Sequence, residues 1–302
     1  MSNNYVKKYE CGNLGLDLPY ANCIYELPLL SFSDMRNGLT LSLVFNRDLK
    51  ERGGNPFDIV DGYKLNLQKR IFWDGNTLCY QGGNGKTERL NEADEIVGLH
   101  TFNDDSRRIV RSVNSGFVLE SSDYSKEVFN SDGNIIEVYD KYGDKLLCFQ
   151  YTANKLSSIQ YREGAAAKTI SFGYDAASRI ISIRYSGNSS DITSLSYDTY
   201  NVFVSHYSGV EYSLYAHEES FTALISGTEG SETFSYGKKC LVDPNDGYTY
   251  ILSDWVGNEE IYKTKYRYPY IIDSPYVSHN HVEITDNLGV KTRVQFSSGK
   301  MT

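Results

Sequence analysis

The main pattern along the chain is an alternation of apolar and polar residues with a period of two. Because successive side chains of a strand point to opposite faces of a sheet, such a run predicts a strand with one buried face. The clearest runs are Leu39–Phe45, Tyr63–Leu67, Lys168–Tyr174, Ile180–Tyr185 and Val290–Phe296. With the weaker runs included, the pattern predicts about twenty short strands.

Turn signals separate these runs. They are Asp74–Asn76, Ser131–Asn134, Tyr142–Asp144, Gly187-Asn188 and Asp286–Gly289, and pairs of Asp or Asn with Gly between alternating runs are typical of β-hairpins. The best helical signal spans Thr87–Ile96, where a short helix and a polar loop are both open. The sequence therefore predicts an all-β fold, a long antiparallel meander of hairpins.

The hairpins form a repeat in the middle of the chain. An aromatic residue is followed by Asp or another polar residue, two variable residues, a turn residue, Arg or Lys, and then Leu or Ile at the start of a strand. The copies are Phe129–Tyr139, Asp140–Leu146, Tyr151–Tyr161 and Tyr174–Ile183. A repeat this short cannot bury its apolar face alone, so we expect consecutive strands to join one growing sheet.

These residues resemble a known family. The segment Tyr174–Ile180 resembles the YD repeat, Tyr-Asp-x-x-Gly-Arg-Leu, with Ser178 and Ile180 in place of Gly and Leu. The segments Gly12–Pro19 and Gly38–Asn46 resemble the lead-in of Rhs proteins. The resemblance covers residues 12–185 well and residues 186–302 loosely.

The resemblance implies a single β domain over residues 1–302, with lead-in strands at 1–125 and YD-type hairpins at 126–302. It also implies a curled, spiralling sheet that forms part of a shell, and a chain that is a fragment or reduced version of longer proteins. In this family the shell encloses a C-terminal toxin or effector domain or presents a surface for adhesion, so the resemblance implies a secreted or cell-surface protein. Asp243–Gly247 shares only Asp-Pro with the autoproteolytic segment of the family, so self-cleavage is not expected.

Charge narrows the classes of partner. The formal net charge is −9 and the sequence pI is about 5.1, which disfavours nucleic acids and anionic membrane surfaces. No apolar run approaches the roughly 20 residues of a membrane span, and the start Met1–Lys8 lacks the apolar core of a signal peptide. No cofactor is expected.

The five cysteines are widely spaced and include no Cys-x-x-Cys pair, so neither a zinc knuckle nor a redox motif is predicted. They are Cys11, Cys23, Cys79, Cys148 and Cys240. Free or buried thiols are the simplest interpretation, and one disulfide stays open.

Three motifs have an ordinary structural interpretation beside a functional one. Gly82–Thr87 is similar to a phosphate loop but has Tyr80 where the first glycine belongs, which favours a hairpin loop. His279 and His281 would share a strand face, as metal ligands can, but further ligands are not evident. Asp243–Gly247 is rich in calcium-type ligands but departs from the EF-hand spacing, which favours a turn.

Adjacent carboxylates such as Asp104-Asp105, Glu218-Glu219 and Glu259-Glu260 would point to opposite faces of a strand. They therefore do not form the acid pair of a glycosidase by themselves. No nucleophile elbow is found either. The sequence predicts no catalytic residue and no metal ligand.

The densest aromatic segment is Tyr266-Arg-Tyr-Pro-Tyr270, followed by Tyr276. Tyr266, Tyr268 and Tyr270 would share one strand face. Cross-strand stabilisation of the sheet is one interpretation, and a platform for a sugar or a protein is the other. Tyr266, Tyr268, Tyr270 and Tyr276 are the candidate binding surface.

Three functions follow in order of preference. The first is a non-enzymatic structural scaffold, the second is a carbohydrate- or protein-binding module at the cell surface, and the third is a β-propeller or sandwich glycosidase. Fold alone does not decide between them.

Overall fold

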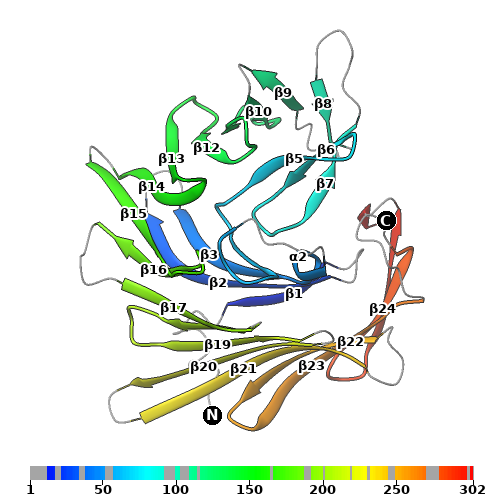
Figure 1. Cartoon of the computed structure of the whole chain (residues 1–302). Helices are drawn as coiled ribbons and strands as arrows, with labels where there is room; N and C mark the ends of the chain where they lie inside the picture. Colours follow the sequence, from blue (N-terminus) through cyan, green and yellow to red (C-terminus); the bar gives the residue numbers. More distant parts are fainter. Residues whose placement is uncertain are drawn as a thin grey trace. The chain divides into compact units, whose positions relative to one another are not determined.

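A computed structural model of the chain describes residues 12–17, 22–33, 38–51, 57–91, 99–102, 109–113, 116–163, 166–186, 192–199, 201–217, 220–229, 232–243, 249–269, 279–297 and 300–301. Within these residues β-strands dominate and pair antiparallel with their neighbours in sequence, so the predicted all-β meander is confirmed (Figure 1). No helix in the described ranges is long and apolar enough to span a membrane.

The chain folds into two compact units. Unit 1 comprises residues 1–29, 43–63 and 193–302, and unit 2 comprises residues 30–42 and 64–192. Strands β2 (Asn22–Ser33), β3 (Gly38–Asn46) and β4 (Tyr63–Leu65) each contain residues of both units. The boundary near residue 192 differs from the expected division at residue 125, and the single domain over 1–302 stays a prediction.

Unit 2 contains a three-stranded sheet and a longer meander. The sheet consists of β5 (Arg70–Asp74), β6 (Thr77–Gln81) and β7 (Thr87–Arg89). The meander consists of β8 (Leu99–Thr101), β9 (Ile109–Val113), β10 (Gly116–Glu120), β11 (Lys126–Phe129), β12 (Ile135–Tyr139), β13 (Lys145–Thr152), β14 (Lys155–Glu163), β15 (Ala166–Tyr174) and β16 (Ile180–Tyr185).

Unit 1 contains a second meander and N-terminal elements that pack on it. The meander consists of β17 (Ile192–Asp198), β18 (Asn201–Ser205), β19 (Glu211–Ala216), β20 (Ser220–Glu229), β21 (Glu232–Val242), β22 (Thr249–Val256), β23 (Glu259–Arg267), β24 (His281–Thr285), β25 (Lys291–Ser297) and β26 (Lys300–Met301). The N-terminal elements are β1 (Asn13–Asp17), the unit 1 parts of β2 and β3, and the helix α2 (Arg47–Glu51).

One five-residue turn recurs between the strands. The N–H of its first residue donates to the C=O of the fifth, and the N–H of its fourth donates to the C=O of the first. The fourth residue has a positive φ. In the described part of the chain, such turns begin at Gly82, Ser121, Asn130, Asp140, Asp175, His206 and Asp286.

The first residue of the turn often stabilises it with its side chain. Asp140 Oδ1 accepts from the N–H of Tyr142 at 2.8 Å and of Asp144 at 2.9 Å. Asn130 and Asp286 make the same two contacts in their own turns. An Asp or Asn side chain can hold two turn amides in this way, which explains why these residues occupy the first position of the turn.

Gly133, the fourth residue of the Asn130 turn, also serves the packing of unit 2. Its φ is +78°, and a Cβ atom there would lie 1.8 Å from the carbonyl oxygen of Ile71. The N–H of Ile71 donates to the Gly133 oxygen at 2.8 Å, and the N–H of Ile135 donates to the Lys69 oxygen at 3.2 Å. Only glycine allows this close approach of β5 to the turn.

The buried face of the unit 2 meander is a row of apolar side chains. Phe149 lies opposite Ile159, and Ile159 lies opposite Ile170, so one row crosses β13, β14 and β15. All three side chains are buried. Cross-strand apolar pairs of this kind are the principal stabilising contacts of a sheet.

Phe221 on β20 is at the centre of the unit 1 core. Its ring stacks on Phe45 at 4.4 Å and lies 5.0 Å from Tyr25. Tyr63 packs on Phe45 at 5.1 Å, and its hydroxyl donates to the Leu214 oxygen at 3.5 Å. The N-terminal elements therefore bury their aromatic side chains against β19 and β20.

Helix α2 was not predicted from the sequence. The segment Thr87–Ile96, for which a helix was left open, begins instead as a strand. Asn46 Oδ1 accepts from the N–H of Asp48 at 2.9 Å, which is an N-cap contact. At Thr87–Ile96, the structure forms β7 over Thr87–Arg89, so a helix beginning at Thr87 was wrong. Residues 92–98 lie outside the described residues.

Candidate functional site

The four tyrosines of the predicted binding surface do not all lie on a described surface: one is buried in a core, and two are outside the described residues. Tyr266 is in β23 and half-buried, whereas Tyr268 follows the strand and is only 3% exposed. Tyr270 and Tyr276 lie outside the described residues. A platform built from all four residues therefore stays a prediction.

Tyr268 belongs to a small core in unit 1, together with Val282 and Phe296. Its ring meets Tyr250 edge-on at 5.6 Å and lies 4.4 Å from the ring of His279. Burial is also the main cause that raises the pKa of the Tyr268 hydroxyl above its usual value. Such packing matches the structural interpretation of the tyrosines, in which they stabilise the sheet.

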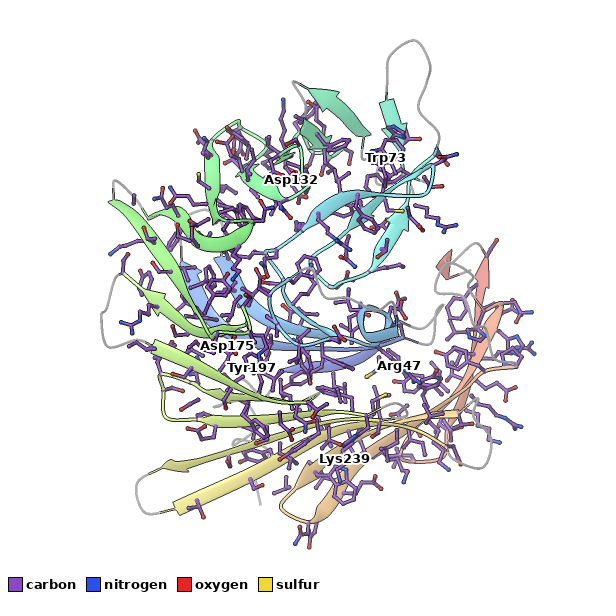
Figure 2. All side chains as sticks on the ribbon, in the orientation of Figure 1. Arg47, Trp73, Asp132, Asp175, Tyr197 and Lys239 are labelled. Carbon is purple, nitrogen blue, oxygen red and sulfur yellow. The ribbon has the colours of Figure 1, made fainter. Side chains whose placement is uncertain are left out.

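Exposed apolar side chains gather instead on the hairpin of β22 and β23. Val256, Ile261 and Tyr262 are exposed there. On the neighbouring strand β21 lies Lys239, which is labelled in Figure 2. Its ammonium lies 4.1 Å above the ring of Trp255, which is half-buried. Val256 and Tyr262 share one face of the hairpin, because Tyr262 lies opposite Asp254 and Val256 is two residues further along β22. We name these two residues the β22–β23 apolar tip. The tip flanks the turn at Gly257-Asn258, and this Gly-Asn pair is the sequence signal that could have located it.

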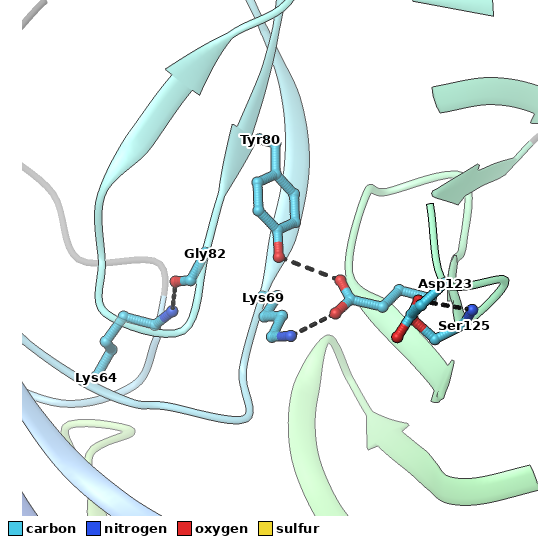
Figure 3. A network of polar contacts seen from close by, with 7 residues as sticks. Lys64, Lys69, Tyr80, Gly82, Asp123 and Ser125 are labelled. Carbon is cyan, nitrogen blue, oxygen red and sulfur yellow. Dashed lines mark hydrogen bonds and ion pairs between the residues drawn. The ribbon is translucent and has the colours of Figure 1, made fainter. Parts of the chain in front are cut away.

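Unit 2 contains a network of polar side chains around Glu127 on β11 (Figure 3). The carboxylate of Glu127 forms an ion pair with Lys69 and accepts a hydrogen bond from the Tyr80 hydroxyl at 3.2 Å. Arg70 donates from Nε to the Gln81 side-chain oxygen at 2.9 Å. The contacts of Glu127 join the three-stranded sheet of unit 2 to its meander, whereas the Arg70–Gln81 bond links β5 to β6 within that sheet.

Lys64 is the most unusual ionisable group in this network. Its side chain is 0% exposed, and its Nζ atom donates to the Gly82 carbonyl oxygen (Figure 3). Burial first, and the positive charges of Lys69 and Arg70 next, lower the pKa of Lys64 well below its usual value. A lysine with a lowered pKa is a candidate nucleophile, but complete burial at Lys64 leaves no room for a substrate to approach.

The glycine-rich segment 82–87 is a hairpin loop, as predicted. It joins β6 to β7, with the N–H of Gly82 donating to the Lys86 oxygen at 3.0 Å and the N–H of Gly85 donating to the Gly82 oxygen at 3.1 Å. Asn84 Oδ1 accepts from the N–H of Lys86 at 3.0 Å. The loop uses its amides for its own closure, and it lacks the strand–loop–helix context of a phosphate site.

The candidate metal ligands are not brought together in the described residues. His279 is buried next to Tyr268, and burial together with the charge of His281 lowers its pKa. No group of three His, Cys, Asp or Glu side chains in the described ranges could hold a metal ion. Of the acidic turn near residue 245, only Asp243 is described; its N–H donates to the Thr249 oxygen at 2.7 Å.

The carboxyl groups with a shifted pKa are all shifted downward within the part of the chain that the structure describes. Hydrogen bonds from neighbouring hydroxyl or backbone N–H groups lower the pKa of Asp123, Asp175 and Asp198. At Glu137, burial raises the pKa, but hydrogen bonds from Lys145 and from a tyrosine outweigh it and lower the pKa. The acid of a glycosidase requires the opposite shift.

A search of protein-family models finds no match to this chain, and a search of curated proteins finds none either.

Proposed function

We propose that this chain is a non-enzymatic β scaffold, resembling part of an Rhs/YD-repeat shell, that encloses or presents a toxin or adhesion domain. The observation that supports this function most is the five-residue turn, because the same backbone closure recurs at the same point of successive hairpins. A secreted or cell-surface location belongs to the same proposal.

The recurring turn suits a scaffold for a physical reason. Each turn satisfies its own amides, so a hairpin can be added without a contact to distant residues. The apolar row of Phe149, Ile159 and Ile170 crosses three strands added in this way. Addition of similar units is how repeat proteins generate large surfaces.

The scaffold function is tested by whether an associated polypeptide is protected from a protease in the native protein. The protein is isolated from its own source with an antibody against this chain, and every associated or covalently continuous polypeptide is identified by mass spectrometry. The preparation is then treated with a nonspecific protease, before and after unfolding. We expect one further polypeptide to resist the protease only while the scaffold is folded.

Two outcomes would overturn the proposal. One is a native protein with no further polypeptide at all. The other is a further polypeptide that is digested equally fast before and after unfolding, because a passenger that is neither enclosed nor held would gain nothing from the scaffold.

A binding module is the second candidate, and the β22–β23 apolar tip favours it. Val256 and Tyr262 are exposed on the same face of the hairpin, and exposed apolar side chains on one face are typical of contact surfaces. A glycan array tests it, with Tyr262→Ala as the variant and Tyr142→Ala, at an exposed turn of unit 2, as the matched control. Signal lost only in Tyr262→Ala would support binding, and no signal above background from the unaltered chain would remove this candidate.

A further inference from the structure

Two of the buried free cysteines lie on elements that face each other within unit 1. Cys23 is on β2 and Cys240 is on β21. The other described cysteines, Cys79 and Cys148, lie on β6 and β13 of unit 2. Cys11 lies outside the described residues.

The strand register brings Cys23 and Cys240 together. Cys23 and Tyr25 are two residues apart on β2, so both side chains point to the same face. The Tyr25 ring lies 5.0 Å from Phe221, and Phe221 is directly opposite Cys240 in the β20–β21 pair. The face of β2 that carries Cys23 is therefore turned toward the face of β21 that carries Cys240.

Two further contacts agree with this placement. Strand β1 pairs with β2, with Leu16 opposite Cys23, and β1 also contacts β21. The two side chains also interact, since Cys240 adds to burial in raising the pKa of the Cys23 thiol. Burial is the main cause that raises the pKa of the Cys23 thiol well above its usual value, so in the folded protein this thiol is a poor nucleophile.

We propose that Cys23 and Cys240 are a disulfide site: when the chain folds in the presence of a small-molecule disulfide, they become linked and covalently fasten β2 to β21. Two successive exchange steps form one Cys23–Cys240 bond. They break the S–S bond of the small-molecule disulfide, which is reduced to two thiols while the two cysteines are oxidised. This inference does not depend on the proposed scaffold function.

The position of the pair indicates when the bond forms and what it does. Both thiols are buried in the folded protein, so exchange has to occur during folding, before the core closes. The two residues are about 220 positions apart, and a link across so long a loop restricts the unfolded chain strongly. The oxidised protein is therefore expected to melt about 5 °C or more above the reduced protein.

Peptide mapping of the unaltered full-length chain tests the site directly. The protein is refolded either with oxidised and reduced glutathione or with excess dithiothreitol, free thiols are alkylated in denaturant, and the chain is cleaved before aspartates without reduction. Asp17 lies between Cys11 and Cys23, so this cleavage gives separate peptides for the two cysteines. We expect a linked peptide pair containing Cys23 and Cys240 only in the glutathione sample, with Cys79 and Cys148 alkylated in both.

Melting curves with variants provide the second measurement. Cys23→Ala and Cys240→Ala should each abolish the difference in melting temperature between oxidised and reduced protein. Cys79→Ala, a buried cysteine of unit 2, is the matched control and should keep the difference. Cys23 and Cys240 both alkylated after oxidative refolding, or either of them linked to Cys11, would overturn the proposal.

Discussion

Two side chains occupy a turn position at which the backbone prefers glycine. The fourth residue of the recurring turn has a φ of 71° at Tyr124 and 69° at Ser178, whereas the other described turns of this type have glycine there. A side chain with a positive φ costs about 1 kcal/mol or more relative to glycine. These two positions therefore hold strain that the rest of the repeat avoids.

Tyr124→Gly is expected to raise the free energy of unfolding by about 1 kcal/mol, because it removes this strain from a residue that is 78% exposed. Tyr142→Gly is the matched control. Tyr142 is 72% exposed, but it is the third residue of the Asp140 turn and has no positive φ. Urea unfolding of both variants checks the prediction, which fails if Tyr124→Gly is no more stable than Tyr142→Gly.

The side chain of Asp140 is expected to contribute to stability through its two hydrogen bonds with turn amides. Asp140→Ala should lower the free energy of unfolding by about 1–2 kcal/mol. Asp140→Asn keeps the accepting Oδ1 atom and should recover most of this loss. Equal stability of the two variants in thermal or urea unfolding would contradict a role as hydrogen-bond acceptor.

Some individual residues could be assigned a structural role from the sequence, and others could not. The turn residues could be predicted because a turn depends on neighbours in the chain, as Asp140 and Gly143 demonstrate. Lys64 could not, because in the run Tyr63–Leu67 it occupies a polar position and the alternation predicts an exposed side chain. Its burial depends on Gly82, which belongs to another hairpin.

At the scale of elements, β4 and the β6–β7 hairpin bury the side-chain nitrogen of Lys64 between them. The pKa of Lys64 is lower in the folded than in the unfolded chain. Between these two pKa values the unfolded chain binds more protons, so the free energy of unfolding should rise with pH up to the unfolded value. Burial of Lys64 thus lowers the free energy of unfolding at pH values below the unfolded pKa.

Lys64→Met is expected to raise the free energy of unfolding at pH 7 by about 1–3 kcal/mol and to flatten its rise toward pH 10. The Gly82 carbonyl oxygen still accepts from the Gly85 N–H in this variant. Lys69→Met, which removes the ion pair with Glu127, is the control and should be destabilising. Urea unfolding between pH 7 and 10 measures both, and an unchanged slope with pH in Lys64→Met would contradict the lowered pKa.

The positions of strands could be predicted from the sequence more closely than the contacts between elements. The alternation at Leu39–Phe45 and Ile180–Tyr185 predicted β3 and β16 almost to their ends, because one buried face determines the pattern. Helix α2 has five residues, too few for a helical period to be visible. Tyr268 could not be assigned to a core or to a surface from sequence, because its neighbours Tyr250 and His279 come from separate segments.

At the scale of the whole molecule, unit 1 depends on contacts between distant parts of the sequence. Phe221 joins β20 to the N-terminal residues Tyr25 and Phe45. Phe203 is on β18 in the same meander, but its ring pairs with Tyr215 at 6.0 Å and it is half-buried. A change at Phe221 therefore tests packing between distant parts of the sequence, and a change at Phe203 tests packing between neighbouring strands.

Phe221→Ala should lower the free energy of unfolding by about 3–5 kcal/mol, because it leaves a cavity beside the rings of Tyr25 and Phe45. Phe203→Ala should lower it by about 1 kcal/mol, as expected away from the core. Hydrogen exchange should detect faster exchange in β2 and β3 for Phe221→Ala only. Equal destabilisation by the two changes would show that the N-terminal strands do not depend on Phe221.

The stacking of Phe45 on Phe221 also has a consequence for synthesis on the ribosome. The two residues are separated by about 180 positions, which at about 5–20 residues per second corresponds to roughly 10–35 seconds of translation. During that interval the nascent chain presents Tyr25 and Phe45 without the ring that will cover them. Chaperones that bind exposed aromatic segments would therefore meet this chain early, and would have to release it once β20 has emerged.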